Sequence, residues 1–281
     1  MTEAREVHTL LSGLAFGESP RWHEGRLWFS NWTAQEIIAV DLTSKSEVAV
    51  RLPFAAFPFS IDWLPDGRLL IVSASERPLL RREADGSLMT YADLSGLSTR
   101  VWNEIVLDGR GSAYINGGSF DAPSGIVALV RPDGSARQVA DEIAFPNGML
   151  VTPDNSTLII AESHAQRLTA FDIDADGSLS HRRVWAELPG GAPDGICMDA
   201  EGAVWVADVP NQHCVRVREG GQVLQTVEVD RGCFACMLGG VEGKTLFIMA
   251  AKWPGFENML NAPRTGQVLT VQAPAPAAGR P

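Results

Sequence analysis

Five polar residues recur at one position of a repeated sequence unit, and their oxygen atoms could together bind a metal ion. They are Glu18, Ser60, Asn103, Asn147 and Asp194, separated by 42, 43, 44 and 47 residues. Two carboxylates and two amides suit a hard or borderline divalent cation. A simpler interpretation stays open for two of them. Asn-Gly and Asp-Gly are common turn dipeptides, so Asn147-Gly148 and Asp194-Gly195 could be ordinary turns.

The repeated unit has the length of a β-propeller blade. Each copy has a polar or small residue, a short apolar strand, a turn, a second apolar strand and then a third, and a weaker sixth copy begins near Ala235. A period in the low forties with several short strands is typical of a four-stranded blade. We therefore predict an all-β, six-bladed β-propeller of four-stranded antiparallel blades, forming one domain over residues 1–272. A β-sandwich or an open meander is the alternative, but neither requires one unit to return six times.

The turns and the C-terminal end carry further signals. Asp85-Gly86, Asp133-Gly134 and Asp176-Gly177 supply the positive φ that tight hairpin turns need. Residues 273–281 are rich in Pro and Ala and have no apolar periodicity, so we expect a disordered tail.

The propeller geometry decides which residues meet. The first strand of each blade lies innermost, so the five polar residues form a ring at one end of the central channel. Because strands alternate in direction, the ends of the second strands return to the same face. Candidate substrate contacts there are Asn31, Trp32, Ser75, Asn116, His164, Asp208 and Lys252, and Trp32 or Trp253 could stack on a sugar face.

Three short motifs occur in an order that resembles the gluconolactonase/regucalcin (senescence marker protein) lactonase family. They are Gly17-Glu18-Ser19-Pro20, Pro146-Asn147-Gly148 and Pro193-Asp194-Gly195, with Trp102-Asn103-Glu104 where that family has an Asn-Asp motif. The resemblance spans residues 10–270 and implies a six-bladed propeller with one catalytic divalent cation at its axis. In such a site Ca, Zn, Mg, Mn and Fe(II) are all acceptable.

The resemblance also implies roles for single residues. Glu18, Asn147 and Asp194 correspond to the metal ligands, and Asn103 corresponds to a residue that contacts substrate beside the metal. Two departures stand out, since Glu104 replaces the family's usual Asp and Arg100 precedes Asn103 by three positions rather than two. We nevertheless predict that Arg100 contacts substrate.

The chemistry expected of this site is metal-dependent hydrolysis of a lactone ring, with a sugar aldonolactone as the substrate. The metal would polarise the carbonyl and activate water, Glu18 and Asp194 would be the catalytic carboxylates, and Asp194 would act as ligand and general base. No Gly-x-Ser-x-Gly nucleophile motif is present. Two alternatives remain, a phosphotriesterase or other esterase on the same site, and a non-catalytic calcium-binding propeller.

Composition limits the partners. The formal net charge is −11 and basic residues do not cluster, so nucleic acid and anionic membranes are not expected as partners. No signal peptide is visible, and four cysteines are too few for a disulfide scaffold, so we expect a cytoplasmic protein, monomeric or weakly homo-oligomeric. Cys233 and Cys236 have C-x-x-C spacing, but we expect them to line the pocket rather than do redox chemistry.

Overall fold

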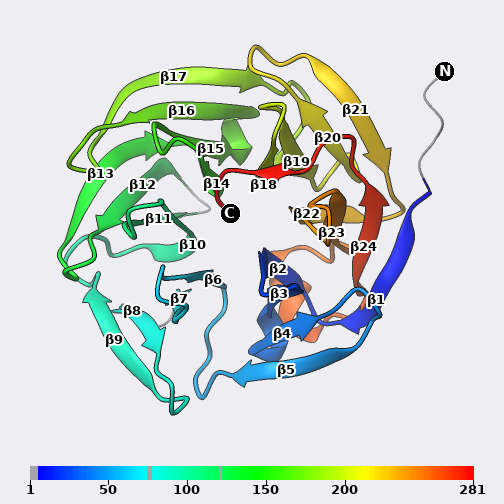
Figure 1. Ribbon diagram of the computed structural model, residues 1–281, viewed down its shortest axis with the longest axis horizontal. Helices are drawn as coiled ribbons and strands as arrows, with labels where there is room; N and C mark the ends of the chain where they lie inside the picture. The colour runs from blue at the N-terminus through cyan, green and yellow to red at the C-terminus, as the bar shows by residue number, and fades with distance from the viewer. Residues whose placement is uncertain (1–5, 75–77, 120–121) are drawn as a thin grey trace.

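The computed structural model describes residues 6–74, 78–119 and 122–281, and this part of the chain consists mainly of strands. Six antiparallel sheets surround a central channel (Figure 1). Five of the sheets have four strands and the other has five. The predicted six-bladed β-propeller is confirmed, and the sandwich and meander alternatives are wrong.

Each blade begins with its innermost strand. Blade 1 contains β2 (Gly17–His23), β3 (Arg26–Asn31), β4 (Glu36–Val40) and β5 (Ser46–Arg51), and blade 2 contains β6 (Phe59–Trp63), β7 (Leu69–Ser73), β8 (Pro78–Arg82) and β9 (Leu88–Asp93). Blade 3 contains β10 (Val101–Leu107), β11 (Ala113–Ser119), β12 (Ala122–Val130) and β13 (Ala136–Ile143). Blade 4 contains β14 (Pro146–Val151), β15 (Thr157–Glu162), β16 (Arg167–Ile173) and β17 (Leu179–Glu187).

Blades 5 and 6 complete the ring. Blade 5 contains β18 (Pro193–Asp199), β19 (Val204–Asp208), β20 (His213–Val217), β21 (Val223–Glu228) and the short β25 (Ala277–Ala278). Blade 6 contains β22 (Gly232–Gly239), β23 (Thr245–Ala251), β24 (Gly266–Gln272) and β1 (His8–Leu14). Because β1 pairs with β24, strands from both ends of the chain close the ring.

The helices are short connections between strands. The described residues contain the 3-10 turns η1 (Trp32–Ala34), η2 (Ser163–Ala165) and η3 (Phe256–Asn261). None of these has the length or the apolar character needed to cross a membrane.

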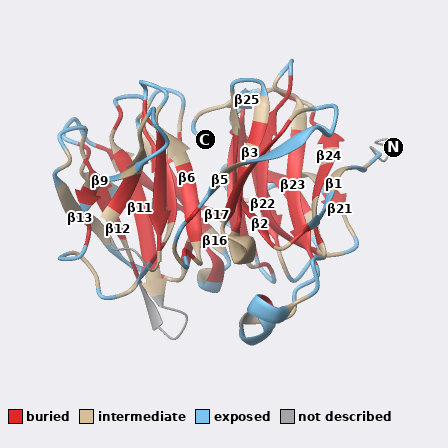
Figure 2. Ribbon diagram, turned by 90° about the horizontal axis from the view of Figure 1, so that it is seen from below, coloured by how far each residue is buried: buried red, intermediate tan, exposed pale blue. Residues whose placement is uncertain are grey.

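Apolar layers between neighbouring blades hold the ring together. All residues of β18 and β19 are buried, and Figure 2 shows buried residues concentrated in the blades. One cluster joins Leu27 of blade 1, Trp205 of blade 5 and Phe247 of blade 6. Fully burying a side chain such as Phe247 stabilises the fold by roughly 1.5–3 kcal/mol. This packing fixes the innermost strands around the channel.

The predicted hairpin turns have the expected backbone. Gly86, Gly134 and Gly177 have φ of 87°, 81° and 81°. In each turn the preceding Asp accepts a hydrogen bond from the backbone N–H two residues later, as in Ser87 N to Asp85 Oδ1 at 2.9 Å. The turns form because Gly accepts positive φ and the Asp side chain closes the loop locally.

The expected disordered tail is contradicted by the structure. β25 pairs with Met198 and Asp199 of β18, and Arg280 forms an antiparallel bridge with Val151 of β14. Ala273 and Ala275 are each 2% exposed. Composition alone gave no sign of this order, because backbone hydrogen bonds to strands distant in the sequence hold the segment. In Figure 1 the C-terminus accordingly lies near the centre of the ring.

Candidate active site

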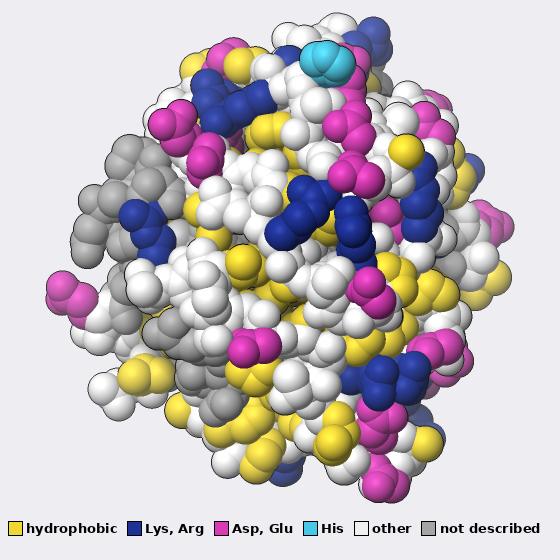
Figure 3. All heavy atoms as spheres, turned by 90° about the vertical axis from the view of Figure 1, so that its left-hand side faces the viewer, with side chains coloured by type: hydrophobic (Ala, Val, Ile, Leu, Met, Phe, Trp, Pro, Cys, Tyr) yellow, Lys and Arg dark blue, Asp and Glu magenta, His cyan; other side chains and the backbone are white. Residues whose placement is uncertain are grey.

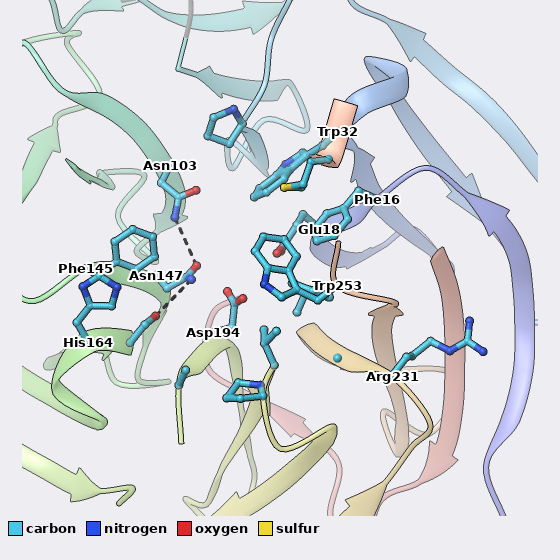
Figure 4. Close-up of a pocket in the computed structure, with 18 of the residues that line it drawn as sticks. Phe16, Glu18, Trp32, Asn103, Phe145, Asn147, His164, Asp194, Arg231 and Trp253 are labelled. Atoms are coloured by element: carbon cyan, nitrogen blue, oxygen red, sulfur yellow. Dashed lines mark hydrogen bonds between the residues drawn. The ribbon is translucent and has the colours of Figure 1, made fainter. Parts of the chain in front are cut away.

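Four of the five recurrent polar residues line one cavity at an end of the channel. Glu18 lies on β2, Asn103 on β10, Asn147 on β14 and Asp194 on β18, and the cavity has a volume of about 680 Å³. Figure 4 shows the side chains of Glu18, Asn147 and Asp194 pointing toward a common centre. The fifth residue, Ser60, is buried and its hydroxyl donates to the Asn103 carbonyl oxygen at 2.6 Å. The shared phase of the repeat therefore does bring these residues together.

Irregular strand pairing accompanies these side chains. The register of the innermost strand shifts between Glu18 and Arg21, between Trp102 and Ile105, between Pro146 and Met149, and between Pro193 and Ile196. A β-bulge redirects a side chain locally, and bulges are frequent beside active sites. Each shift falls at the polar residue of its blade. A regularly paired strand would point that side chain in a different direction.

The glycines after Asn147 and Asp194 serve close packing rather than turns. Both dipeptides lie within strands, so the turn interpretation is wrong. A Cβ on Gly148 would lie 2.5 Å from the Asp194 carbonyl oxygen, and one on Gly195 would lie 2.6 Å from Ala235 Cα. Only glycine permits neighbouring inner strands to approach this closely, and this close approach brings the polar residues together.

The two carboxylates of the ring are buried and repel each other. Glu18 is 5% exposed and Asp194 is 8% exposed. Burial, followed by the charges of Asp194 and Glu104, holds the pKa of Glu18 well above its usual range. Burial, followed by the Glu104 charge, does the same to the pKa of Asp194. Each acid thus pays a desolvation cost with little positive charge nearby to offset it.

One buried oxygen of this group has no hydrogen-bond partner among the described residues. Asp194 Oδ1 is sealed from solvent and accepts no hydrogen bond, although buried polar atoms are usually paired. The described residues contain no set of three or more His, Cys, Asp or Glu placed to hold a metal. The group here differs in composition, with two carboxylates and one amide. These oxygens fit a hard cation, which would pair Asp194 Oδ1 and reduce the repulsion between the acids.

Amide side chains link blades 3 and 4 beside the carboxylates. Asn103 Nδ2 donates to Asn147 Oδ1 at 3.4 Å, and Asn147 Nδ2 lies 3.5 Å from Ser163 Oγ (Figure 4). The Ser163 hydroxyl in turn donates to the Pro193 carbonyl oxygen at 2.7 Å. This chain orients the Asn147 amide with its oxygen on the side of Asn103 and its nitrogen toward Ser163.

A buried ion pair links β2 to β10 and gives Glu104, the departure from the family pattern, a structural role. Arg21 donates to Glu104 Oε1 at 3.1 Å and to the Ile105 carbonyl oxygen at 2.5 Å. The Ser19 hydroxyl donates to the same Glu104 oxygen at 3.1 Å. Glu104 does not line the cavity. Its longer side chain instead binds residues of β2 that follow Glu18, so it acts as a support for that strand.

Two predicted substrate contacts do not fit their positions. Asn116 is fully buried, accepts from Glu104 N at 3.2 Å and donates to the Asn147 carbonyl oxygen at 2.6 Å. Both ends of its amide therefore bind protein, and it braces β14 rather than facing substrate. Arg100 is also absent from the cavity lining, although its neighbour Val101 is part of it.

The remaining candidates from the second strands include residues that line the cavity and buried residues that bind protein. His164 lines the cavity and stacks on Phe145 with ring centroids 4.6 Å apart, and Trp32 and Lys252 line the cavity as well. Asn31 and Asp208 are buried and bind loop backbone, since Asn31 Oδ1 accepts from Phe16 N at 3.0 Å. Ser75 lies outside the described residues.

The sequence predicted Trp32 and Trp253 at this face but did not reveal that they belong to an aromatic wall. Phe16, Phe57 and Phe234 line the cavity together with Trp32 and Trp253. The three Phe rings come from separate segments and not from one repeat position, so no periodic signal marked them. The position of Phe16 immediately before the Gly17-Glu18 motif was the nearest clue.

The cysteines are placed differently from the prediction. Cys233 and Cys236 are buried and do not line the cavity, whereas Phe234 between them does. Cys236 Sγ lies 4.0 Å from Cys197 Sγ in the layer between blades 5 and 6. The expectation that these two cysteines line the pocket is wrong, because the register shift between Cys233 and Ala235 turns Phe234 to the cavity.

Comparison with known proteins agrees with this geometry. Residues 16–252 match the family model described as "SMP-30/Gluconolactonase/LRE-like region". Regucalcin from Xenopus laevis is 28% identical over 253 residues, covering 84% of this chain and 83% of the relative. Pentonolactonase XacC from Haloferax volcanii is 26% identical over 255 residues, covering 82% and 84%. A solved luciferin-regenerating enzyme superposes with a TM-score of 0.84 at 20% identity, with 98% of each chain covered, which shows the shared fold.

Proposed function

Because the chain belongs to the SMP-30/gluconolactonase/LRE-like family, we propose that it hydrolyses lactones with one divalent cation held at the channel end. The observation that carries the proposal is the buried convergence of Glu18, Asn147 and Asp194, with an unpaired Asp194 oxygen at its centre. Two acids so placed are costly in an empty pocket and become favourable beside a cation. The pentonolactonase among the relatives supports a lactone as the substrate.

The protein residues have separate roles in this reaction. Glu18, Asn147 and Asp194 would hold the cation, which when bound supplies Lewis-acid polarisation of a carbonyl oxygen and lowers the pKa of water. Asp194, whose carboxylate lines the cavity, is suited to take a proton from the attacking water. The Asn103 amide, on the cavity beside Asn147, orients the substrate. One water is consumed. Its oxygen bonds to the carbonyl carbon, the ring C–O bond breaks, and the leaving oxygen receives a proton.

Sugar aldonolactones remain the substrate class predicted from the sequence. The test strips the protein of metal with a chelator and restores Ca, Mg, Mn, Zn or Fe(II) singly. Hydrolysis of gluconolactone, xylonolactone, unsubstituted γ-butyrolactone and paraoxon is then followed for each form.

The proposal expects turnover of at least one lactone that is lost on chelation and restored by a cation. Faster turnover of paraoxon than of any lactone would favour the phosphotriesterase alternative. Tight cation binding without any turnover would favour the calcium-binding alternative. The similarity to regucalcin is the reason to test it.

A further inference from the structure

The aromatic residues of the cavity form one continuous wall. Ring centroids are 5.3 Å apart for Phe57 and Trp32, 5.6 Å for Trp32 and Phe16, 4.4 Å for Phe16 and Phe234, and 5.5 Å for Phe234 and Trp253. Most of these contacts are edge-to-face or tilted, as in a packed apolar core. We call these five residues the aromatic wall. Phe16 and Phe234 belong to one buried cluster with Met259, and Trp32 and Phe57 pack against this cluster.

The three Phe rings and the Trp32 ring of the wall present carbon rather than hydrogen-bonding groups. The Trp32 indole Nε1 donates to the Phe59 carbonyl oxygen at 2.6 Å, so its polar atom is directed into the protein. Arg231, at the same side of the cavity, is bound to Asp230 through Nε at 2.6 Å and to the Thr265 carbonyl oxygen at 2.8 Å. In Figure 4 the Arg231 guanidinium points away from the centre of the cavity.

Three polar side chains of the lining face the aromatic wall from the opposite side of the cavity. Asn103, Asn147 and His164 come from blades 3 and 4, whereas Phe16, Trp32 and Trp253 lie across the cavity from them (Figure 4). The carboxylates of Glu18 and Asp194 lie between the two sides. A lactone whose carbonyl lies at these carboxylates therefore contacts polar side chains on one side and aromatic rings on the other.

A polyhydroxylated lactone uses this cavity poorly. A sugar hydroxyl placed against the Phe rings or the Trp32 ring loses its hydrogen bond to water and gains no acceptor or donor from them in return. The volume of about 680 Å³ is in the range that encloses a drug-sized ligand. Such a cavity has room for a substituent beyond the lactone ring, and the wall favours an apolar one.

We propose that the substrate is a lactone bearing an apolar alkyl or aryl substituent, which packs on the aromatic wall while the ring carbonyl faces Glu18, Asn147 and Asp194. This inference rests on the proposed lactone hydrolysis. It differs from the aldonolactone prediction in the group attached to the ring. The wall residues thus determine specificity, and the carboxylates carry out the chemistry.

The test compares γ-lactones whose ring substituent lengthens from methyl to hexyl, together with a phenyl-substituted γ-lactone and gluconolactone. Each buried methylene is expected to raise kcat/KM about fourfold, which is about 1,000-fold over the five methylenes between methyl and hexyl. The hexyl and phenyl substrates distinguish an alkyl from an aryl substituent. Both are expected to exceed gluconolactone.

Binding is measured separately from turnover. Alkyl-substituted cyclopentanones keep the ring carbonyl but contain no ester bond, and their Kd is read from tryptophan fluorescence. The wild-type Kd is expected to fall about fourfold for each added methylene. Trp253→Ala should reduce the ratio between hexyl and methyl compounds about tenfold, in Kd and in kcat/KM, and Trp253→Phe should restore most of it.

The matched control is Leu260→Ala. Leu260 lies on η3, close in sequence to Trp253, but it is 72% exposed and does not line the cavity. Its substitution should leave the ratio unchanged.

The outcomes separate the two proposals. Ketone affinity that does not change with chain length, together with rapid gluconolactone hydrolysis, would overturn the apolar substituent and leave lactone hydrolysis standing. Ketone affinity that rises with chain length while no lactone is hydrolysed would overturn the proposed function and leave the apolar site standing.

Discussion

Replacing Asp194 by Asn should stabilise the metal-free protein while abolishing its response to cations. Asp194 Oδ1 is buried without a hydrogen bond, and burial and the Glu104 charge raise the pKa of this carboxyl. Asn keeps the shape and removes the charge. Removing a buried charge that has no hydrogen-bond partner should raise the free energy of unfolding by about 1–3 kcal/mol. For a chain of this size that corresponds to an increase of roughly 2–10 °C in Tm.

The gain depends on pH in a direction that follows from the raised pKa. The folded protein binds more protons than the unfolded chain between the ordinary value of 3.8 and the raised folded value. Wild-type stability therefore decreases as the pH rises through that interval. The advantage of the Asn variant should be largest at alkaline pH and should disappear as the pH approaches the ordinary value.

Cations should reverse the order of stability. At a cation concentration of about 100 times Kd, the wild type gains about 2.7 kcal/mol, whereas the variant should gain little. Thermal unfolding with chelator and with each cation measures both effects, and lactone turnover should fall by at least about 100-fold in the variant. The control is Asp141→Asn, an exposed acid, for which neither effect is expected. An equal cation-induced rise in Tm in the Asp194 variant and the wild type would show that Asp194 is not a metal ligand. A metal-free variant less stable than the metal-free wild type would refute the argument from buried charge.

Three further predictions concern the surrounding structure. Burial alone would raise the pKa of Glu162, but hydrogen bonds from Thr169 and Ala144 N and two arginines lower it. Glu162→Gln should therefore lower the free energy of unfolding by about 1–3 kcal/mol at neutral pH. Urea unfolding should show this difference shrinking as the pH falls below 4.5. Gly195→Ala should cost about 1–3 kcal/mol in urea unfolding by overpacking β22, whereas Gly96→Ala, which has open space around it, should cost little. Deleting residues 274–281 removes the pairing with β18 and Val151 and should lower Tm by roughly 2–10 °C. The kcat/KM of this variant should not change, because the tail binds the ends of β14 and β18 away from Asn147 and Asp194.

The fold could be predicted from the sequence because each blade is encoded locally and repeatedly. The turn residues around Gly86 and Gly134 and the apolar strands beside them recur with one period, and repetition of a unit that cannot bury its own surface implies a closed ring. The same repetition identified Glu18, Asn147 and Asp194. Equivalent positions of equivalent blades must face the same axis, so their convergence followed from their phase.

The rest of the site depends on contacts that no period encodes. Asn116 and His164 were both expected at second-strand ends. Asn116 instead lies within β11, with its amide bound between β10 and β14, whereas His164 lies on η2 and lines the cavity. The aromatic wall joins Phe234 of β22 to single rings from connections between strands. Residues 273–281 are ordered only because distant strands offer them hydrogen bonds. The sequence by itself determined the ring and the polar residues that face its axis, since both are periodic. The tertiary structure alone decided which neighbours surround them, because side-chain burial depends on chain segments brought together only when the ring closes.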